Sequence, residues 1–261
     1  MGIFLLTVSC SLSILPKSKF DWLAVNPRSS FDTFSLPVEL PFPRNPDFCG
    51  REDILEEIYQ KLQPLGDKFE RNVCVLSAMG GIGKTQIALE YAHRHGHLYK
   101  SVFWLGAQDM DAVESSGRLI LESLVRHYAK KSPSPQDCYT DISHKLGMPG
   151  LVNPSGHLQL DPMQSAWRLV KQWLTEDGNA KWLLLVDNND DLDAVDLGRL
   201  LPTCNQGHAI VTSRRPELGF HGHWIAVGVV EPGEGLSLLL KGMKIEDKKL
   251  SEDGEHLRMI T

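Results

Sequence analysis

Apolar residues along this chain form five short continuous runs, and segments with helical spacing lie between them. The runs cover Asn72–Ser77, Ser101–Leu105, Trp182–Val186, His208–Thr212 and Trp224–Gly228. Continuous apolar runs of this length are typical of parallel strands that helices cover on both faces. Helical spacing of apolar residues is found over Glu52–Leu62, Lys84–His95, Asp111–Tyr128 and Met163–Leu174. The pattern therefore predicts a three-layer α/β/α fold around a mainly parallel, five-stranded sheet.

The two ends of the chain differ from this alternating region. Six of the 15 prolines stand at positions 16, 27, 37, 41, 43 and 46, and proline at that density blocks regular secondary structure. We expect residues 1–45 to form a poorly ordered, Pro-rich leader and residues 46–243 to form one α/β domain. Its last helix is expected from Glu231 to Leu240, and residues 131–156, rich in Pro, Ser and Gly, are expected to form a loop. Residues 244–261 are expected to be a charged tail, the truncated start of a further helical domain.

Composition narrows the class of protein further. Hydrophobic residues make up 42% and charged residues 23% of the chain, close to the average for soluble globular proteins. The net charge of -6 gives no general help in binding nucleic acid, whose phosphates attract basic proteins. The apolar stretch Ile3–Val8 is shorter than the ~20 residues that span a bilayer. We therefore expect neither a membrane span nor a nucleic-acid partner.

The cysteines and the N-terminus bear on the cellular compartment. The five cysteines contain no C-x-x-C pair, which argues against a disulfide framework or a zinc ribbon. No Lys or Arg precedes the apolar stretch near the N-terminus, although a signal peptide normally has one. We expect a cytoplasmic protein, while a signal function of residues 1–15 stays open.

The segment Ala78–Thr85 lies between the first predicted strand and the first predicted helix after it. It matches the phosphate-binding loop at its Gly-Lys-Thr end. Its glycines let backbone N–H groups approach phosphate oxygens, and the N-terminus of the following helix attracts the anion as well. Lys84 would reach the β- and γ-phosphates, and the Thr85 hydroxyl would ligate Mg²⁺. The complete motif begins with glycine, so we expect some backbone strain at Ala78.

A second strand supplies the acid that such a site requires. Leu183–Asp187 delivers Asp187 at the carboxyl end of a buried strand, where ligands of parallel α/β sheets bind. We expect this strand to neighbour the phosphate-loop strand, and Asp187 to hold Mg²⁺ through water because carboxylate oxygens suit this hard cation. An aspartate that caps the next helix is the alternative interpretation.

The residues after Asp187 bear on hydrolysis. Many P-loop ATPases have a glutamate that activates the attacking water at the position of Asn188, and an amide cannot accept that proton. Asp190 and Asp191 are close enough in sequence to substitute as catalytic groups, but a solvated acidic loop explains them equally well. Arg214, at the end of the His208–Thr212 run, could read the γ-phosphate with its planar guanidinium.

Taken together and in order, these segments resemble the NB-ARC family of STAND-class NTPases, which includes plant resistance proteins and the apoptosome scaffold. The resemblance covers roughly residues 46 to 243, and the ordered combination is much more specific than any single motif. The matching pieces are Phe48–Glu52 with the helix after it, Met79–Ala92, Val102–Leu105, Trp182–Asp191 and Ile210–Arg214.

The resemblance implies that the domain binds ADP or ATP with Mg²⁺. It also implies that Cys49 and Arg51 lie against the adenine, although a surface charge at the helix N-terminus is an equal alternative for Arg51. Thr85 and Asp187 would hold the metal. The residues assigned to the nucleotide are Cys49, Arg51, Met79, Gly80, Gly81, Ile82, Gly83, Lys84, Thr85 and Gln86.

The function implied is a nucleotide-dependent signalling switch with slow or no ATP hydrolysis and with protein partners or further domains. Family members continue after the sensor strand into a small helical domain and a winged helix, and this sequence has no match to either. We therefore expect a truncated nucleotide-binding core. An active ATPase or phosphotransferase and a degenerate interaction module stay open as alternatives.

Overall fold

The structure is a computed structural model that describes residues 40–63, 71–131, 139, 143–144, 146, 148–161 and 164–242. The tail and most of the leader lie outside the described residues, so the boundaries expected at 45 and 243 stay predictions. The strands are β1 (Asn72–Ser77), β2 (Ser101–Gly106), β3 (Trp182–Asp187), β4 (His208–Ser213) and β5 (His223–Ala226). The α-helices are α1 (Glu52–Leu62), α2 (Lys84–His95), α3 (Met110–Lys131), α5 (Ala166–Thr175), α6 (Leu197–Leu200) and α7 (Pro232–Gly242). Short 3₁₀ helices are η2 (Gly96–Leu98), η3 (Asp177–Asn179) and η4 (Pro216–His221).

The five strands form one fully parallel sheet in the spatial order β2-β3-β4-β1-β5, which confirms the expected sheet. The strand order corrects one expectation, because β4 lies between β1 and the strand that ends in Asp187. β4 is buried at all six positions, as a central strand requires. Apolar runs alone could not show this order, since β1, β3 and β4 are all continuous and buried on both faces.

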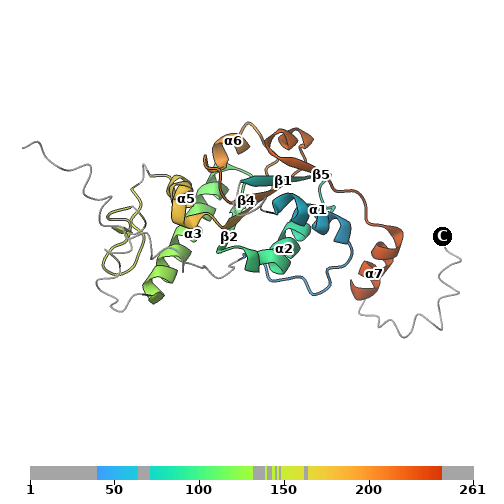
Figure 1. Ribbon diagram of the computed structural model, residues 1–261, viewed down its shortest axis with the longest axis horizontal. Coiled ribbons are helices and arrows are strands. Elements are labelled where there is room, and N and C mark those ends of the chain that lie inside the picture. The colour runs from blue at the N-terminus through green and yellow to red at the C-terminus, as the bar shows by residue number, and fades with distance from the viewer. Residues whose placement is uncertain are drawn as a thin grey trace, which may run out of the picture. The chain divides into compact units, whose positions relative to one another are not determined.

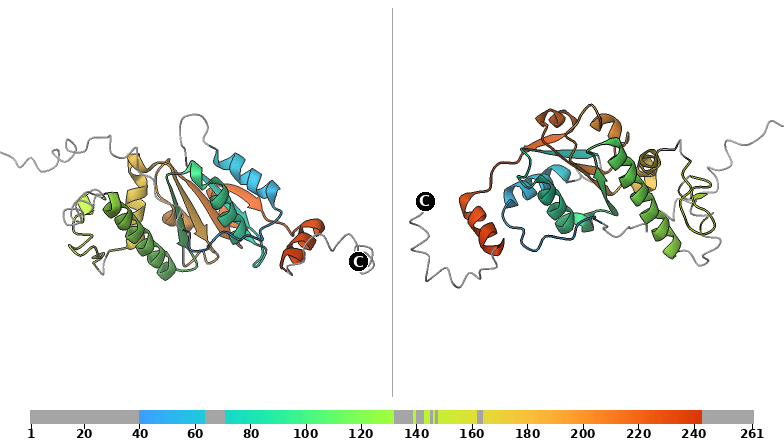
Figure 2. Two further views of the ribbon diagram at one scale, coloured as in Figure 1. Left: turned by 90° about the horizontal axis from the view of Figure 1, so that it is seen from below. Right: turned by 180° about the vertical axis from the view of Figure 1, so that it is seen from behind.

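Helices cover both faces of the sheet, so the expected three-layer α/β/α architecture is confirmed. Figure 1 shows α1 and α2 on one side of the strands and α3 and α5 on the other, and Figure 2 shows the same layers from two further directions. Alternate residues of β1 divide between the layers. Cys74 and Leu76 pack with α1 and α2, whereas Val73 and Val75 pack with α3 and α5.

Element ends differ from the expected ones by a few residues. α3 runs over Met110–Lys131, one residue further than expected at its start and three at its end. α5 begins at Ala166, three residues after the expected start. The side chain of Ser165 accepts a hydrogen bond from the backbone N–H of Arg168 at 3.1 Å, and this N-cap fixes the start of the helix.

The last described helix, α7, extends away from the sheet (Figure 1) and corresponds to the helix expected from Glu231 to Leu240. Three of its leucines, Leu236, Leu238 and Leu239, are exposed. Neither α7 nor any other helix within the described ranges is long and apolar enough to cross a membrane.

Candidate nucleotide-binding site

The loop between β1 and α2 presents backbone rather than side chains. Gly81 and Gly83 have φ angles of 82° and 99°, in the left-handed region that glycine adopts without strain. A Cβ atom at either position would meet no atom within 4 Å, so space is open beside the loop. Gly83 is the N-cap of α2 and has no side chain to cap it. The first N–H groups of the helix therefore face the loop, as in anion sites at helix N-termini.

The strain expected at Ala78 is absent. Among the described non-glycine residues, positive φ angles occur at Arg51 and Asn188, both at 64°, and not at Ala78. The Ala78 N–H donates a hydrogen bond to the carbonyl oxygen of Ser213 on β4 at 3.3 Å. Alanine therefore fits this position, because its φ angle is outside the left-handed region and its N–H is bonded to β4.

Lys84 lies across the inside of the loop. Its Nζ donates hydrogen bonds to the carbonyl oxygens of Ala78 and Met79, both at 2.9 Å, and only 9% of the residue is exposed. Burial lowers the pKa of the Lys84 ammonium group, with a raising contribution from the charge of Asp190 and a lowering one from Arg214. The ammonium group thus lies in the loop with carboxylates and an arginine close enough to act on it.

Thr85 meets the end of β3 through a direct hydrogen bond. Its Oγ1 donates to Oδ1 of Asp187 at 2.7 Å, and Oγ1 of Thr212 donates to the same oxygen at 2.7 Å. The Thr212 oxygen also accepts the N–H of Asn188 at 3.0 Å. Asp187 therefore reaches the phosphate loop across β4, and a β4 residue holds it in place.

Thr212 had no role assigned from the sequence. It belongs to the same segment as Arg214, but its hydroxyl matters only because β4 is inserted between β1 and β3. One feature of the sequence could have indicated a role for Thr212: it stands at the carboxyl end of an apolar run, two residues before Arg214. Side chains at that end of a parallel strand face the ligand edge of the sheet.

The two candidate catalytic aspartates occupy different environments. Asp190 accepts a hydrogen bond from the backbone N–H of Arg214 at 2.7 Å and forms an ion pair with the Nε of the same residue at 3.0 Å. Asp191 is exposed, and its carboxylate accepts the N–H groups of Asp193 and Ala194, both at 3.1 Å. Asp191 thus caps a turn, whereas Asp190 is engaged with the arginine that was expected to read phosphate.

The turn before α1 contacts both the phosphate loop and α7. Arg51 is 8% exposed, and its guanidinium donates to the carbonyl oxygens of Ile82 and Val229, each at 3.4 Å. Its backbone N–H donates to Oε1 of Glu234 at 3.2 Å. Arg51 is therefore a buried link between three segments and not a charge at the surface.

A cluster of charged residues holds this N-terminal segment on α2. The Glu90 carboxylate is 3% exposed and accepts from Nη2 of Arg44 at 2.6 Å and from Nε of Arg94 at 2.7 Å. Arg94 also pairs with Glu52 on α1 at 2.5 Å, and its guanidinium lies 5.9 Å from the centre of the Phe48 ring. The helix that begins at the phosphate loop is thus tied to the segment that precedes α1.

The groups at the carboxyl end of the sheet surround a pocket of about 240 Å³. It contains most of the residues predicted from the loop motif and, in addition, Asn188 and Thr212. Cys49, Arg51, Met79, Ile82, Asp187, Asp190 and Asp191 do not line it. The lining residues are Gly80, Gly81, Gly83, Lys84, Thr85, Gln86, Asn188, Thr212 and Arg214.

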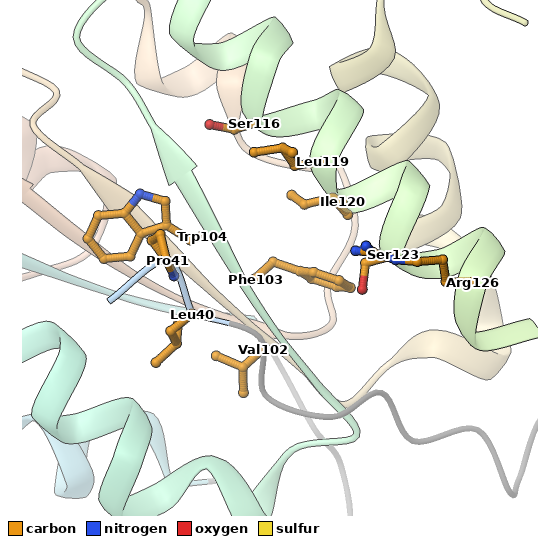
Figure 3. Close-up of a pocket in the computed structure, with 10 residues that line it drawn as sticks. All are labelled: Leu40, Pro41, Val102, Phe103, Trp104, Ser116, Leu119, Ile120, Ser123 and Arg126. Atoms are coloured by element: carbon orange, nitrogen blue, oxygen red, sulfur yellow. The ribbon is translucent and has the colours of Figure 1, made fainter. Parts of the chain in front are cut away.

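A cavity of similar size, about 230 Å³, lies beside the edge strand β2 (Figure 3). Its walls are mainly apolar: Phe103 and Ile120 face it from β2 and α3, and Arg126 lies at one end. It lacks the glycine-rich backbone and the clustered charge of the loop site, so the two cavities differ in the chemistry that they offer.

The parallel five-stranded sheet and the glycine-rich loop between β1 and α2 define an α/β domain with the fold of the P-loop NTPase class. No protein-family model matches the chain. The chain is similar to a nucleotide-binding leucine-rich repeat (NLR)-like protein of Hyaloscypha variabilis, with 25% identity over 235 residues that cover 82% of this chain and 20% of the relative. This chain therefore spans about a fifth of the length of that relative.

Among solved structures, the chain is similar to the ORC2 protein of Aeropyrum pernix in its ADPNP–ADP complexes. The identity is 15% and the TM-score 0.45, over 84% of this chain and 56% of the other. A likeness of this size carries no argument about the site, whose chemistry follows from the geometry above.

Proposed function

We propose that this chain is the nucleotide-binding part of a signalling switch of the NB-ARC type, which binds ADP or ATP with Mg²⁺ and hydrolyses ATP slowly or not at all. The observation that carries the proposal is the 2.7 Å hydrogen bond between Thr85 and Asp187, beside the buried ammonium group of Lys84. Backbone N–H groups and a lysine suit phosphate oxygens, and hydroxyl and carboxylate oxygens suit Mg²⁺.

The residues at the end of β3 fit a magnesium ion that a nucleotide shares. Mg²⁺ usually keeps several waters and takes one or two protein oxygens besides the phosphates, and Thr85 and Asp187 can supply these. Within the described part of the chain, no group of three or more His, Cys, Asp or Glu side chains could hold a metal ion. A bound ion would neutralise phosphate charge, while Lys84 and the loop N–H groups orient the phosphates.

In this proposal Cys49 and Arg51 hold the base. The hydrogen bond from Arg51 to the carbonyl oxygen of Ile82 joins their turn to the phosphate loop. A nucleoside whose phosphates occupy the loop would therefore extend toward this turn. Residues 46–243 are the proposed extent of the domain.

The proposal of slow hydrolysis rests on the lack of a free proton acceptor among the candidates. Asn188 lines the pocket but is an amide, Asp190 is bonded to Arg214, and Asp191 caps a turn. General-base catalysis needs an acceptor within hydrogen-bonding reach of the attacking water. An active ATPase is the competing function, and turnover distinguishes the two.

Nucleotide binding is tested by titrating the purified chain with Mg·ADP in a calorimeter. We expect Lys84→Ala to weaken binding by roughly tenfold or more, because hydrogen bonds to charged groups contribute about 1.5–3 kcal/mol each. Lys61→Ala, at the exposed end of α1, is the matched control and should bind as the unsubstituted protein does. Absence of binding in the unsubstituted protein would leave a degenerate interaction module as the function.

Turnover is tested by steady-state phosphate release in excess Mg·ATP. We expect less than about one event per minute, whereas typical enzymes run at about 1–10³ per second. Release far above one per minute would support the ATPase instead.

The proposal includes protein partners or further domains. Because the chain corresponds to 20% of the NLR-like protein, we place its partners among further domains of such a longer protein or among separate proteins in the cytoplasm. Nucleotide state would change these contacts, since a γ-phosphate would bond to Lys84 and Arg214, which line the pocket, and a diphosphate lacks this group.

A further inference from the structure

Asp190 contacts three consecutive residues at the end of β4, namely Ser213, Arg214 and Arg215. Its Oδ1 accepts the backbone N–H of Arg214 at 2.7 Å, and its Oδ2 pairs with the Nε of the same residue at 3.0 Å. Oδ1 also lies 3.3 Å from the Ser213 hydroxyl, and the Asp190 carbonyl oxygen accepts the Nε of Arg215 at 3.1 Å. Both carboxylate oxygens are thus used to hold the segment after β4.

The held arginine lies on the phosphate loop. A Cβ atom at Gly80 would be 3.1 Å from the Cζ and Nη2 of Arg214, so the guanidinium lies against the Gly80 backbone. Arg214 also lines the pocket together with Lys84 and Thr85. Within the described residues its Nη1 and Nη2 make no hydrogen bond, and these are the two nitrogens with which arginine binds phosphate bidentately.

The fixed position of Arg214 depends on Asp190, because the arginine side chain is 64% exposed and Asp190 is 24% exposed. An exposed arginine has about 2 kcal/mol of rotamer entropy, which only specific contacts can overcome. The charge of Asp190 also acts on Lys84. Burial has the largest effect and lowers the pKa of the Lys84 ammonium group; the charge of Asp190 raises this pKa, and the charge of Arg214 lowers it. A carboxylate at this place lets two cations lie side by side in the absence of a phosphate.

We propose that Asp190 is a positioning residue that holds Arg214 over Gly80 and thereby sets how strongly the site prefers a nucleoside triphosphate to a diphosphate. This inference rests on the proposed function, because it assumes that the pocket binds nucleotide phosphates. It replaces the role of proton acceptor considered for Asp190 from the sequence, since neither oxygen is free for that role.

The test compares Mg·ATPγS and Mg·ADP binding by calorimetry in the full chain and in Asp190→Asn, which keeps the shape of the side chain. We expect the ratio of the two affinities to fall by roughly tenfold, the value of one hydrogen bond to a charged group. ADP affinity should change by less than about threefold, because the diphosphate lacks the group that Arg214 contacts. Asp193→Asn, an exposed aspartate three residues away, is the matched control.

Arg214→Gln and the double variant separate a positioning role from a catalytic one. We expect the double variant to have the same affinity ratio as Arg214→Gln alone, because Asp190 acts through Arg214 and the effects are not additive. An unchanged ratio in Asp190→Asn, with slower single-turnover phosphate release, would overturn the inference in favour of a proton acceptor. Additive effects of the two substitutions on the affinity ratio would also overturn it. If the unsubstituted protein bound no nucleotide at all, the proposed function itself would be overturned.

Discussion

The candidate site has two halves that are built differently. The phosphate half comprises the loop Ala78–Thr85 with Asp187 and Thr212, and the clasp half comprises Arg44–Glu52 with Glu90, Arg94 and Glu234. The loop of the phosphate half is continuous in sequence and faces open space beside Gly81 and Gly83. The clasp half joins residues as far apart as 185 positions, as in the contact between the Cys49 thiol and the Glu234 carbonyl oxygen.

Because of this difference, we expect substitutions in the two halves to affect different quantities, either the stability of the fold or the affinity for the nucleotide. Contacts of the clasp half, such as the buried Glu90 carboxylate with its two arginines, exist without a ligand and stabilise the fold. The loop N–H groups of the phosphate half face the space that a ligand would fill. Substitutions in the clasp half should therefore lower the free energy of unfolding, and substitutions in the phosphate half should mainly lower affinity for the nucleotide.

The largest loss of stability is expected for Gly50→Ala. Gly50 has a φ angle of 70°, and a Cβ atom there would overlap the Glu234 carboxyl group. A left-handed conformation costs alanine about 1–2 kcal/mol, and the displaced carboxylate would lose its bond to the Arg51 N–H, about 1 kcal/mol more. Urea unfolding measures the sum.

Glu234→Ala provides the control for this prediction. In the Glu234→Ala background the same Gly50 substitution should cost only the backbone part, because no carboxylate is left to displace. An equal cost in both backgrounds would show that α7 does not pack on this turn.

A somewhat smaller loss is expected for Glu90→Gln, about 1–3 kcal/mol at pH 7, because the three hydrogen bonds from Arg44 and Arg94 lose their charged acceptor. Burial raises the pKa of the Glu90 carboxyl, but the hydrogen bonds and charges of Arg44 and Arg94 outweigh it and hold the pKa below its ordinary value. The stabilisation is therefore present above the unfolded-state pKa, about 4.3, and is lost as the pH falls through the folded-state pKa.

The measurement is unfolding by urea between pH 3 and pH 7 in Glu90→Gln and in Glu57→Gln, an exposed glutamate on α1. The difference between Glu90→Gln and the unsubstituted protein should shrink as the pH falls. A difference that is constant with pH would mean that packing, and not the carboxylate charge, accounts for the loss.

In the phosphate half, Thr212→Val should lower stability by about 2 kcal/mol, because its hydroxyl takes part in two hydrogen bonds and each has a net value of about 1 kcal/mol. Its effect on binding should be larger in relative terms, because the hydroxyl holds Asp187 beside Thr85. We expect the gain in ADP affinity on adding Mg²⁺ to fall, while affinity measured in EDTA stays within about twofold. The control is Thr175→Val, at the end of α5, which should leave ADP affinity unchanged both with Mg²⁺ and in EDTA.

The smallest effect is expected for Glu52→Gln in the clasp half. Glu52 is 66% exposed in its pair with Arg94, and exposed ion pairs contribute about 0.2–1 kcal/mol. The hydrogen bond from Arg94 lowers the pKa of the Glu52 carboxyl, so this contribution, too, should vanish in acid. Thermal unfolding measures the difference in stability between Glu52→Gln and the unsubstituted protein, and 1 M NaCl should make this difference smaller. A loss as large as that of Glu90→Gln would contradict the ranking.

The fold and the phosphate half were largely predictable, because their signals are local. β1 and α2 have the expected bounds, since an apolar run, a glycine cluster and a helical pattern follow one another in the chain. Of the clasp half, only Phe48–Glu52 was assigned from the sequence, through the family resemblance, and Arg51 was left undecided. Its partners Ile82, Val229 and Glu234 lie far away in sequence, and no spacing rule connects them to Arg51.

The sequence by itself determined the strands, the helices and the glycine-rich loop with Lys84 and Thr85, because each depends on the order of neighbouring side chains. Only the tertiary structure decided that β4 lies between β1 and β3, that Thr212 holds Asp187, and that Asp190 is bound to Arg214. These outcomes depend on which strand pairs with which. Backbone hydrogen bonds make that choice with groups that every residue shares, so the side-chain pattern of a single strand does not encode it.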